Sequence, residues 1–190
     1  MRFKSKIVGL LSLFLSACAP SSVSVIGGTY YAVQYDFAEF FAATDHRNFQ
    51  VILVGNPFPN MDQSTVARDL LPVMQAAKPR PALTFTYDAP VERPRPWYRL
   101  VLVVDSAPDL GSYAVCNGET RTGPHRPGVF YVYAVYCRND QAMSETTAWV
   151  QATGPNDPRV AQMFRELFQV VFNDSPAYGR NLNGRGGMRQ

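Results

Sequence analysis

The segment Val129–Cys137 reads VFYVYAVYC, and a strand over these residues has hydrophobic side chains on both of its faces. The segment 99–104 reads RLVLVV and is apolar on both faces as well. Strands that are covered on both faces show such continuous runs. Both segments are therefore predicted as strands, and 99–104 is predicted as a central strand of a β-sheet.

Other parts of the chain have the composition of further strands. Residues 49–54 form an apolar run that ends at the breaker Gly55-Asn56-Pro57-Phe58-Pro59, which favours a rigid turn over an anion-binding loop. Residues 30–41 are aromatic-rich and are predicted to be extended, although the phenylalanines within them also suit one face of a helix. Three more segments are predicted as strands, namely 82–87, 112–116 and 145–152.

Two segments have the periodicity of amphipathic helices. In the first, over 63–77, apolar residues recur at helical spacing after the candidate caps Asp62 and Ser64, and Pro72 should kink or shorten the helix. In the second, Asp157 and a proline begin an unbroken apolar stripe that runs to Phe172. Helices packed on one face of a mostly antiparallel sheet give an α+β two-layer sandwich, which is the predicted fold class.

The first residues have the parts of a bacterial export signal. Arg2, Lys4 and Lys6 precede an apolar stretch, 7–15, that is too short to cross a bilayer of about 30 Å. LSAC at 15–18 then matches the lipobox. The chain thus resembles bacterial lipoprotein precursors over its first 20 residues, which implies cleavage before Cys18 and acylation of Cys18. An ordinary signal peptide with a chance cysteine is the alternative.

The resemblance implies an organisation and an address for the whole chain. It divides the chain into a signal peptide at 1–17, a lipidated tether at 18–28, a globular α+β domain at 29–173 and a disordered Gly/Arg tail at 174–190. Several acyl chains make a durable membrane anchor. Ala19, where aspartate would favour the inner membrane, indicates an outer-membrane anchor with the domain facing the periplasm.

The charge of the chain excludes one class of partner. Removal of Arg2, Lys4 and Lys6 with the signal peptide reduces 18 basic residues to 15, which equals the 15 acidic residues. Nucleic-acid binding rests on clustered cationic side chains. We therefore expect no nucleic-acid partner; the membrane, through the lipid anchor, and an envelope protein are the expected partners.

Once Cys18 carries lipid, Cys116 and Cys137 remain as a pair. An even number of cysteines in an oxidising compartment favours a disulfide. Such a bridge would stabilise the fold by about 3 kcal/mol in the chain-entropy model. Two buried free thiols are the alternative, and a metal site would lack ligands.

No residue set reads as an active site, and no cofactor or metal is expected. His46 and His125 lie among loop signals, without a second histidine or a cysteine at ligand spacing. The carboxylate pairs Asp36/Glu39 and Asp105/Asp109 lie in or near turns and are expected to be solvated or to cap helices. The familiar hydrolase, phosphate-loop and dinucleotide motifs are absent from the sequence.

The excess of tyrosine is the feature with the clearest functional content. Tyrosines gather in the strand segments, and on an uncovered sheet face they would favour an interface; packing at the sheet rim is the alternative. We predict a non-enzymatic envelope lipoprotein that binds a partner through Tyr131 and Tyr133. A small-ligand carrier with an apolar cavity, or an envelope hydrolase built around His46 or His125, are the other hypotheses.

The whole chain also resembles small lipoproteins of alphaproteobacteria. The residues that carry this likeness are an apolar strand, the GNPF sequence, a helix, a strand reading YRLVLV and two later cysteines, which lie here at 49–54, 55–58, 63–77, 98–103, 116 and 137. This resemblance implies no particular activity.

Overall fold

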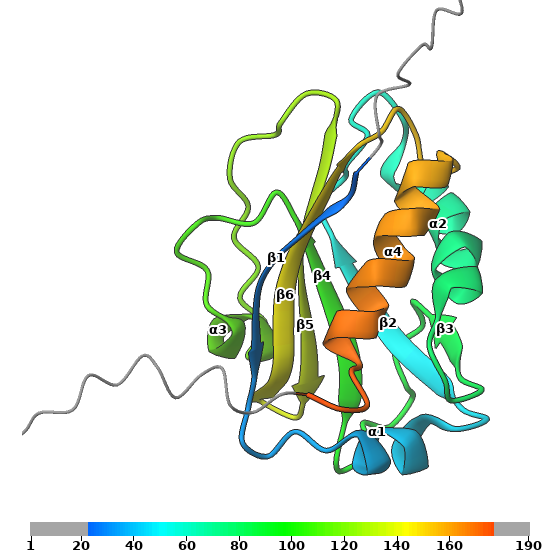
Figure 1. Cartoon of the computed structure of the whole chain (residues 1–190), viewed down its shortest axis with the longest axis vertical. Coiled ribbons are helices and arrows are strands. Elements are labelled where there is room, and N and C mark those ends of the chain that lie inside the picture. Colours follow the sequence, from blue (N-terminus) through cyan, green and yellow to red (C-terminus); the bar gives the residue numbers. More distant parts are fainter. Residues whose placement is uncertain (1–22, 177–190) are drawn as a thin grey trace, which may run out of the picture.

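The structure is a computed structural model that describes residues 23–176. A single sheet has the strand order β1-β6-β5-β4-β2-β3, and helices lie on both sides of it and at one end (Figure 1). Cys18, the signal peptide and most of the predicted tail lie outside the described residues. The strands are β1 (Val25–Tyr31), β2 (Asn48–Val54), β3 (Thr84–Thr86), β4 (Tyr98–Val104), β5 (Val129–Arg138) and β6 (Gln141–Gln151).

β4, which was predicted as a central strand, pairs with β5 in the middle of the sheet. β4 and β5 are antiparallel, with Arg99 opposite Cys137 and Val103 opposite Tyr133. β5 then joins β6 through the two-residue turn Asn139-Asp140, and Asn139 has the positive φ, 55°, that such turns use. These strands are almost entirely buried, as expected from a run that is apolar on both faces.

The sheet is mixed, and this corrects the prediction of a mostly antiparallel sheet. β1, β6, β5 and β4 are antiparallel neighbours. β2 runs parallel to both β4 and β3. The parallel pairs arise because α2 (Gln63–Ala77) and the long connection after β3 carry the chain back to the same end of the sheet between strands.

Helices α2 and α4 (Pro158–Val171) cover one face of the sheet, as predicted (Figure 1). The Asp157 side chain accepts a hydrogen bond from the Arg159 backbone N–H and caps α4. Pro72 lies within α2, which nevertheless runs on to Ala77, so the expected shortening is wrong. The exposed ring of Pro72 faces away from the core.

Two segments predicted as strands are helical instead. Residues 37–44 form α1 (Phe37–Thr44), capped by Asp36. Phe37 and Phe40 pack this helix against the end of the core, where Phe40 stacks on Phe172 at 4.5 Å, whereas Phe41 is exposed. Residues 112–116 form the short helix α3 (Ser112–Cys116). β1 also begins at Val25, within the segment predicted as a tether.

The face of the sheet opposite α2 and α4 is covered as well, over part of its area. α3 and the connection before it pack on β4 and β5 and form a second, smaller core. Tyr133 lies in this core and is only 7% exposed. The sandwich therefore has a partial third layer, and this layer holds the candidate sites. The second core consists of Val101, Val103, Leu110, Val115, Cys116, Tyr133, Val135 and Cys137.

Candidate functional site

A pocket of about 520 Å³ lies beside α3, at the end of the sheet where β4 begins. Arg99 lines it and is only 3% exposed although it carries a full charge. The side chain lies on the α3 face because Arg99 pairs with Cys137, whose thiol is bonded to α3. The remaining lining residues are Arg93, Pro94, Arg95, Trp97, Cys116, Asn117, Asn139 and Asp140.

The Arg99 guanidinium is held by backbone carbonyls and by no carboxylate. Its Nη2 donates to the Cys116 carbonyl at 2.5 Å, and its Nη1 donates to the Asn139 carbonyl at 2.8 Å. Within residues 23–176, no carboxylate oxygen lies within 4.0 Å of the Arg99 guanidinium, which is the limit for an ion pair. Because an arginine has five N–H donors in a planar fork, several remain for a ligand.

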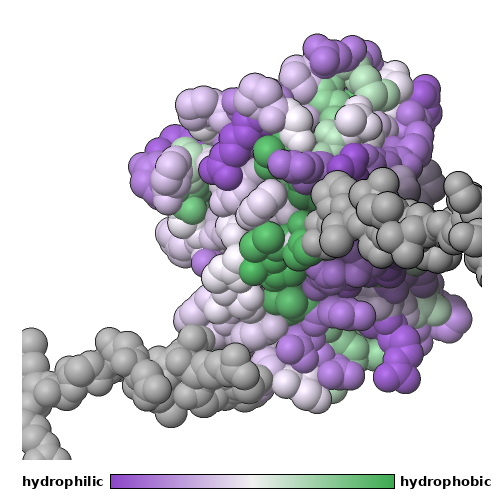
Figure 2. Space-filling model, turned by 45° about the horizontal axis from the view of Figure 1, so that its top comes forward, coloured by the Kyte–Doolittle hydropathy of each residue, from purple (hydrophilic) through white to green (hydrophobic). Residues whose placement is uncertain are grey.

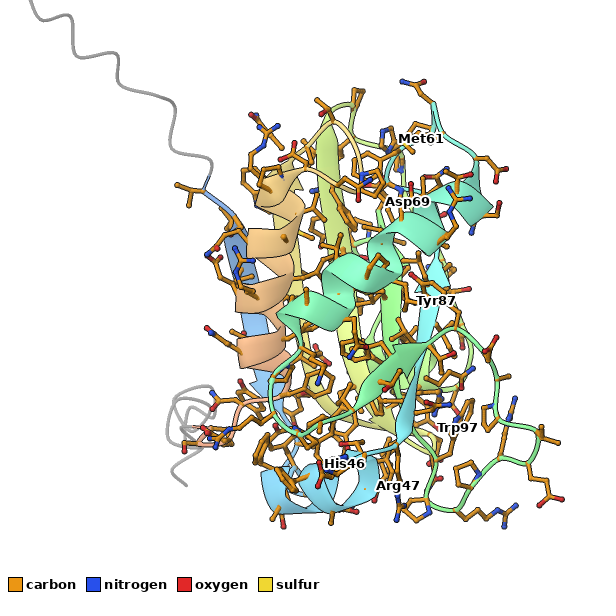
Figure 3. The ribbon with its side chains drawn as sticks, turned by 90° about the vertical axis from the view of Figure 1, so that its right-hand side faces the viewer. His46, Arg47, Met61, Asp69, Tyr87 and Trp97 are labelled. Carbon is orange, nitrogen blue, oxygen red and sulfur yellow. A yellow bond between two sulfur atoms is a disulfide. The ribbon has the colours of Figure 1, made fainter. Side chains whose placement is uncertain are left out.

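Trp97 adds a second unpartnered donor to the same pocket. Its ring lies 3.6 Å from the Arg99 guanidinium carbon and 4.4 Å from that of Arg93, so it contacts both cations. The indole Nε1 is buried and has no hydrogen-bond partner in the described structure. Buried polar atoms normally have partners, so the unpaired Nε1 is an exception among the polar groups beside this pocket. Figure 3 shows Trp97 where the connector after β3 returns to the sheet.

The electrostatics of the pocket are those of a buried cation whose nearby carboxylate, Asp140, forms no ion pair with it. Burial first, and then the positive charge of Arg93, lower the pKa of Arg99 to about 10, while Asp140 acts in the opposite direction. Arg99 is therefore still charged at neutral pH. A neighbouring pocket of about 560 Å³ shares Pro94 and Arg95 with the first and is also lined by Arg47, so the positive character extends across this end.

A different constellation lies at the opposite end of β4. The Asp105 carboxylate accepts a hydrogen bond from His125 Nδ1 over 2.8 Å, and both residues line a pocket of about 390 Å³ with Ser106 and Arg126. The Asp105 side chain is 7% exposed, and its Oδ1 has no hydrogen-bond partner in the described structure. Asp105 also has φ of 46°, in the left-handed region where strained functional residues occur.

The expected pair Asp105/Asp109 is thus separated by the fold. Asp109 lies at the surface and forms an ion pair with Arg121 at 2.9 Å, whereas Asp105 is buried against His125, so the expectation that Asp105 is solvated is wrong. Asp36 caps α1, as expected, and Glu39 accepts a bidentate hydrogen bond from Arg138. The sequence signal for Asp105 was its place directly after a buried strand.

The disulfide is present as predicted between Cys116 and Cys137, with Cα atoms 5.7 Å apart. Cys116 lies in the helix α3, and not in the strand that was expected. The bridge fixes the end of α3 over β5 and so places the Cys116 carbonyl that Arg99 contacts.

The tyrosines do not form an exposed binding face. Tyr133 is buried in the second core, because α3 covers that part of the sheet, and burial raises its pKa above the usual range. Tyr136 is 2% exposed in the main core. Tyr131 is half-buried, with the Arg126 guanidinium 4.2 Å from its ring centre. The expectation of exposed tyrosines at both 131 and 133 is therefore wrong for Tyr133.

The two histidines do not converge. His46 precedes β2 at the Arg99 end of the sheet, with a side chain that is 81% exposed (Figure 3). His125 is bonded to Asp105 at the other end. In the part of the chain that the structure describes, no three histidine, cysteine, aspartate or glutamate side chains are grouped to hold a metal ion. None of the helices within 23–176 has the length and hydrophobicity to span a membrane.

The GNPFP segment forms a turn, as predicted. The Asn56 side chain accepts from the Phe58 backbone N–H and donates to the Met61 carbonyl, each at 2.8 Å.

No protein-family model matches this chain, and neither the curated proteins nor the solved structures include one with significant similarity to it.

Proposed function

We propose that this chain is a lipid-anchored envelope protein whose globular domain binds a small anionic group, a carboxylate or a phosphate, in the pocket around Arg99. The observation that carries the proposal is a buried guanidinium that has no carboxylate partner and lines the same pocket as an unpartnered indole N–H. The domain would thus be a binding module and not an enzyme.

The chemistry of the pocket favours an anion as its ligand. A buried charge without a counter-charge is costly, and the planar fork of arginine matches the oxygens of carboxylate and phosphate groups. Arg93 and Arg95 add positive charge, and neither forms an ion pair within the described residues. An apolar carrier cavity would instead need hydrophobic walls.

The sequence at residues 15–18 supports the anchor, since LSAC matches a lipobox. The first strand begins at Val25, shortly after Cys18, so a lipid on Cys18 would hold the domain close to the bilayer. The proposed location is the outer membrane, with the domain in the periplasm.

Thermal unfolding of the full chain in detergent tests the binding site. Sodium phosphate and sodium acetate are compared with sodium chloride at one ionic strength. At about ten times its Kd, a ligand stabilises the folded state by about 1.4 kcal/mol, which raises Tm by about 4 °C for a domain of this size. The salt that gives the larger shift identifies the group that is bound.

Two variants show whether the shift comes from this pocket. Arg99→Gln should lose most of the shift relative to its own Tm in chloride. Arg68→Gln, which changes an exposed arginine on α2 paired with Asp69, should keep it. Equal shifts in both variants, or no shift in the unmodified protein, would exclude the pocket as an anion site.

The Asp105–His125 pair favours a second candidate function, an envelope hydrolase. A buried carboxylate that accepts from Nδ1 fixes the tautomer of a histidine and leaves Nε2 to accept a proton from water or from a hydroxyl group. Ser106 is 8% exposed and lines the same pocket. The strained backbone of Asp105 is consistent with a functional role.

Hydrolysis of p-nitrophenyl acetate by the full chain tests this second candidate. His125→Ala should reduce the initial rate by about 100-fold or more, the lower end of the contribution of a general base. His46→Ala removes the exposed histidine at the other end of the sheet and should leave the rate unchanged. Equal rates in both variants would exclude the Asp105–His125 pair as a hydrolytic site.

A further inference from the structure

Three side chains from neighbouring strands form a row at the end of the sheet that is opposite the Arg99 pocket. Val25 of β1 pairs with Trp149 of β6, and Trp149 pairs with Tyr131 of β5. Directly opposed residues of antiparallel strands present their side chains on the same face. The row therefore lies on the face that carries α3, beyond the area that α3 covers, because α3 is tied to Cys137 at the other end of β5.

The row is accessible and has a mixed apolar and polar character. Val25 and Trp149 are each 37% exposed, and Val23, two residues earlier, is 62% exposed. The Arg126 guanidinium lies 4.2 Å above the Tyr131 ring at one end of the row. Figure 2, which brings the top of Figure 1 forward, shows one patch of strongly hydrophobic residues within an otherwise more polar face; tryptophan and tyrosine take the pale colours of the middle of its scale.

The sequence before the row places it near the proposed anchor. Cys18 precedes Val25 by seven residues, and a fully extended chain of this length spans at most about 25 Å. With acyl chains on Cys18, Val25 at the near end of the row cannot lie farther than this from the bilayer surface. Tryptophan and tyrosine favour the boundary between headgroups and acyl chains, and arginine favours the headgroups.

We propose that the row Val25–Trp149–Tyr131, with Arg126 at its edge, rests on the phospholipid surface and orients the domain on the membrane. This inference depends on the lipid anchor proposed above. Arg99 lies at the start of β4. Tyr131 lies beside the other end of β4, where its carbonyl accepts a hydrogen bond from the Asp105 backbone N–H. The two lie about 20 Å apart along the strand. The Arg99 pocket thus lies on the same face of the sheet, at the end that is farther from the proposed contact with the bilayer.

The chain has only two tryptophans, which makes the surface measurable. Lipidated Trp97→Phe protein, in which Trp149 is the sole fluorophore, is reconstituted in vesicles of phosphatidylethanolamine and phosphatidylglycerol brominated near the headgroup end of the acyl chains. We expect quenching of Trp149 emission by at least two-fold relative to unbrominated vesicles. In Trp149→Phe protein, Trp97 should be quenched little.

A pair of charge substitutions tests the contact without altering either fluorophore. Val25→Glu should reduce the quenching of Trp149. Val33→Glu, at a residue that is 87% exposed beyond the other end of β1, should leave it unchanged. Thermal unfolding of both variants establishes that the fold is retained.

The outcomes separate the anchor from the surface. Protein that floats with the vesicles while Trp149 is unquenched overturns the inference and leaves the anchor in place. The same holds if Trp149 becomes shielded only as protein concentration rises, because a second copy would then cover the row. Protein that carries no acyl chain and does not float overturns both proposals.

Discussion

Gly55 lies beside Val104, where the parallel strands β2 and β4 end. Gly55 follows β2 with φ of 84°, and a Cβ added there would lie 3.1 Å from Val104 Cβ and 3.3 Å from Val104 O. A left-handed backbone and a close neighbour both favour glycine at this position. The chain therefore turns tightly out of β2 beside the residue that precedes Asp105.

Gly55→Ala should lower the free energy of unfolding by more than about 1 kcal/mol, because the new methyl group meets both strain and crowding. Gly154→Ala is the matched control, since a Cβ at Gly154 meets no atom within 4 Å and its φ is not left-handed. Urea titration of the two variants makes the comparison. A Gly55→Ala protein as stable as the control would show that neither constraint matters.

At the scale of elements, α4 contributes most to the main core and depends on its first turn. Arg159 holds the Asp157 carboxylate through two side-chain contacts and its backbone N–H, and its hydrogen bonds lower the pKa of Asp157 to about 2. An unfolded aspartate titrates near 3.9. Asp157 thus stabilises the fold above about pH 4, and this stability is lost as the pH falls through 2.

Asp157→Ala should cost about 1 kcal/mol of stability at pH 7 through loss of the cap and the ion pair. The difference from the unmodified protein should shrink as the pH falls from 4 toward 2, because the native carboxylate is then protonated. Denaturant unfolding at several pH values measures this. A difference that is constant down to pH 2 would show that the charge of Asp157 contributes nothing.

The sequence predicts the elements whose pattern is long and uniform. α4 follows from a cap and an unbroken stripe, and β4 and β5 follow from runs that are apolar on both faces. α3 is too short, at five residues, for a period to decide between helix and strand. The pairing of β2 with β4 depends on contacts between distant segments, which local pattern does not encode.

Some residues of the candidate site could likewise be predicted from the sequence, and others could not. The disulfide could be predicted, because the cysteine count and the expectation of an oxidising compartment favour it. Arg99 was visible as the one charge in an apolar strand, yet its lack of a carboxylate partner depends on what the fold brings beside it. The hydrogen bond between Asp105 and His125 joins residues that are 20 positions apart across a loop, so no local motif predicts it.

For the whole molecule, the disulfide connects stability to the site. It closes a loop with a sequence separation of 21 and fixes α3, whose Cys116 carbonyl accepts from Arg99. Replacement of both Cys116 and Cys137 by alanine should cost about 3 kcal/mol of stability. It should also weaken anion binding at temperatures where the variant is still folded. Unchanged binding would show that α3 holds its place without the bridge.

The proposed arrangement gives the two ends of the sheet different tasks. The end at Trp149 lies toward the lipid, and the end at Trp97 carries the anion pocket. Each end contains one of the two tryptophans, so each indole N–H reports on its own end.

The most direct measurement is a ¹⁵N–¹H correlation spectrum of the labelled full chain in detergent, in which the two indole N–H groups give separate signals. Addition of phosphate or acetate at constant ionic strength should move the Trp97 signal saturably and leave the Trp149 signal in place, and Arg99→Gln should abolish the movement. A Trp97 signal that stays fixed, or that moves equally in Arg99→Gln, would contradict an anion site at Arg99.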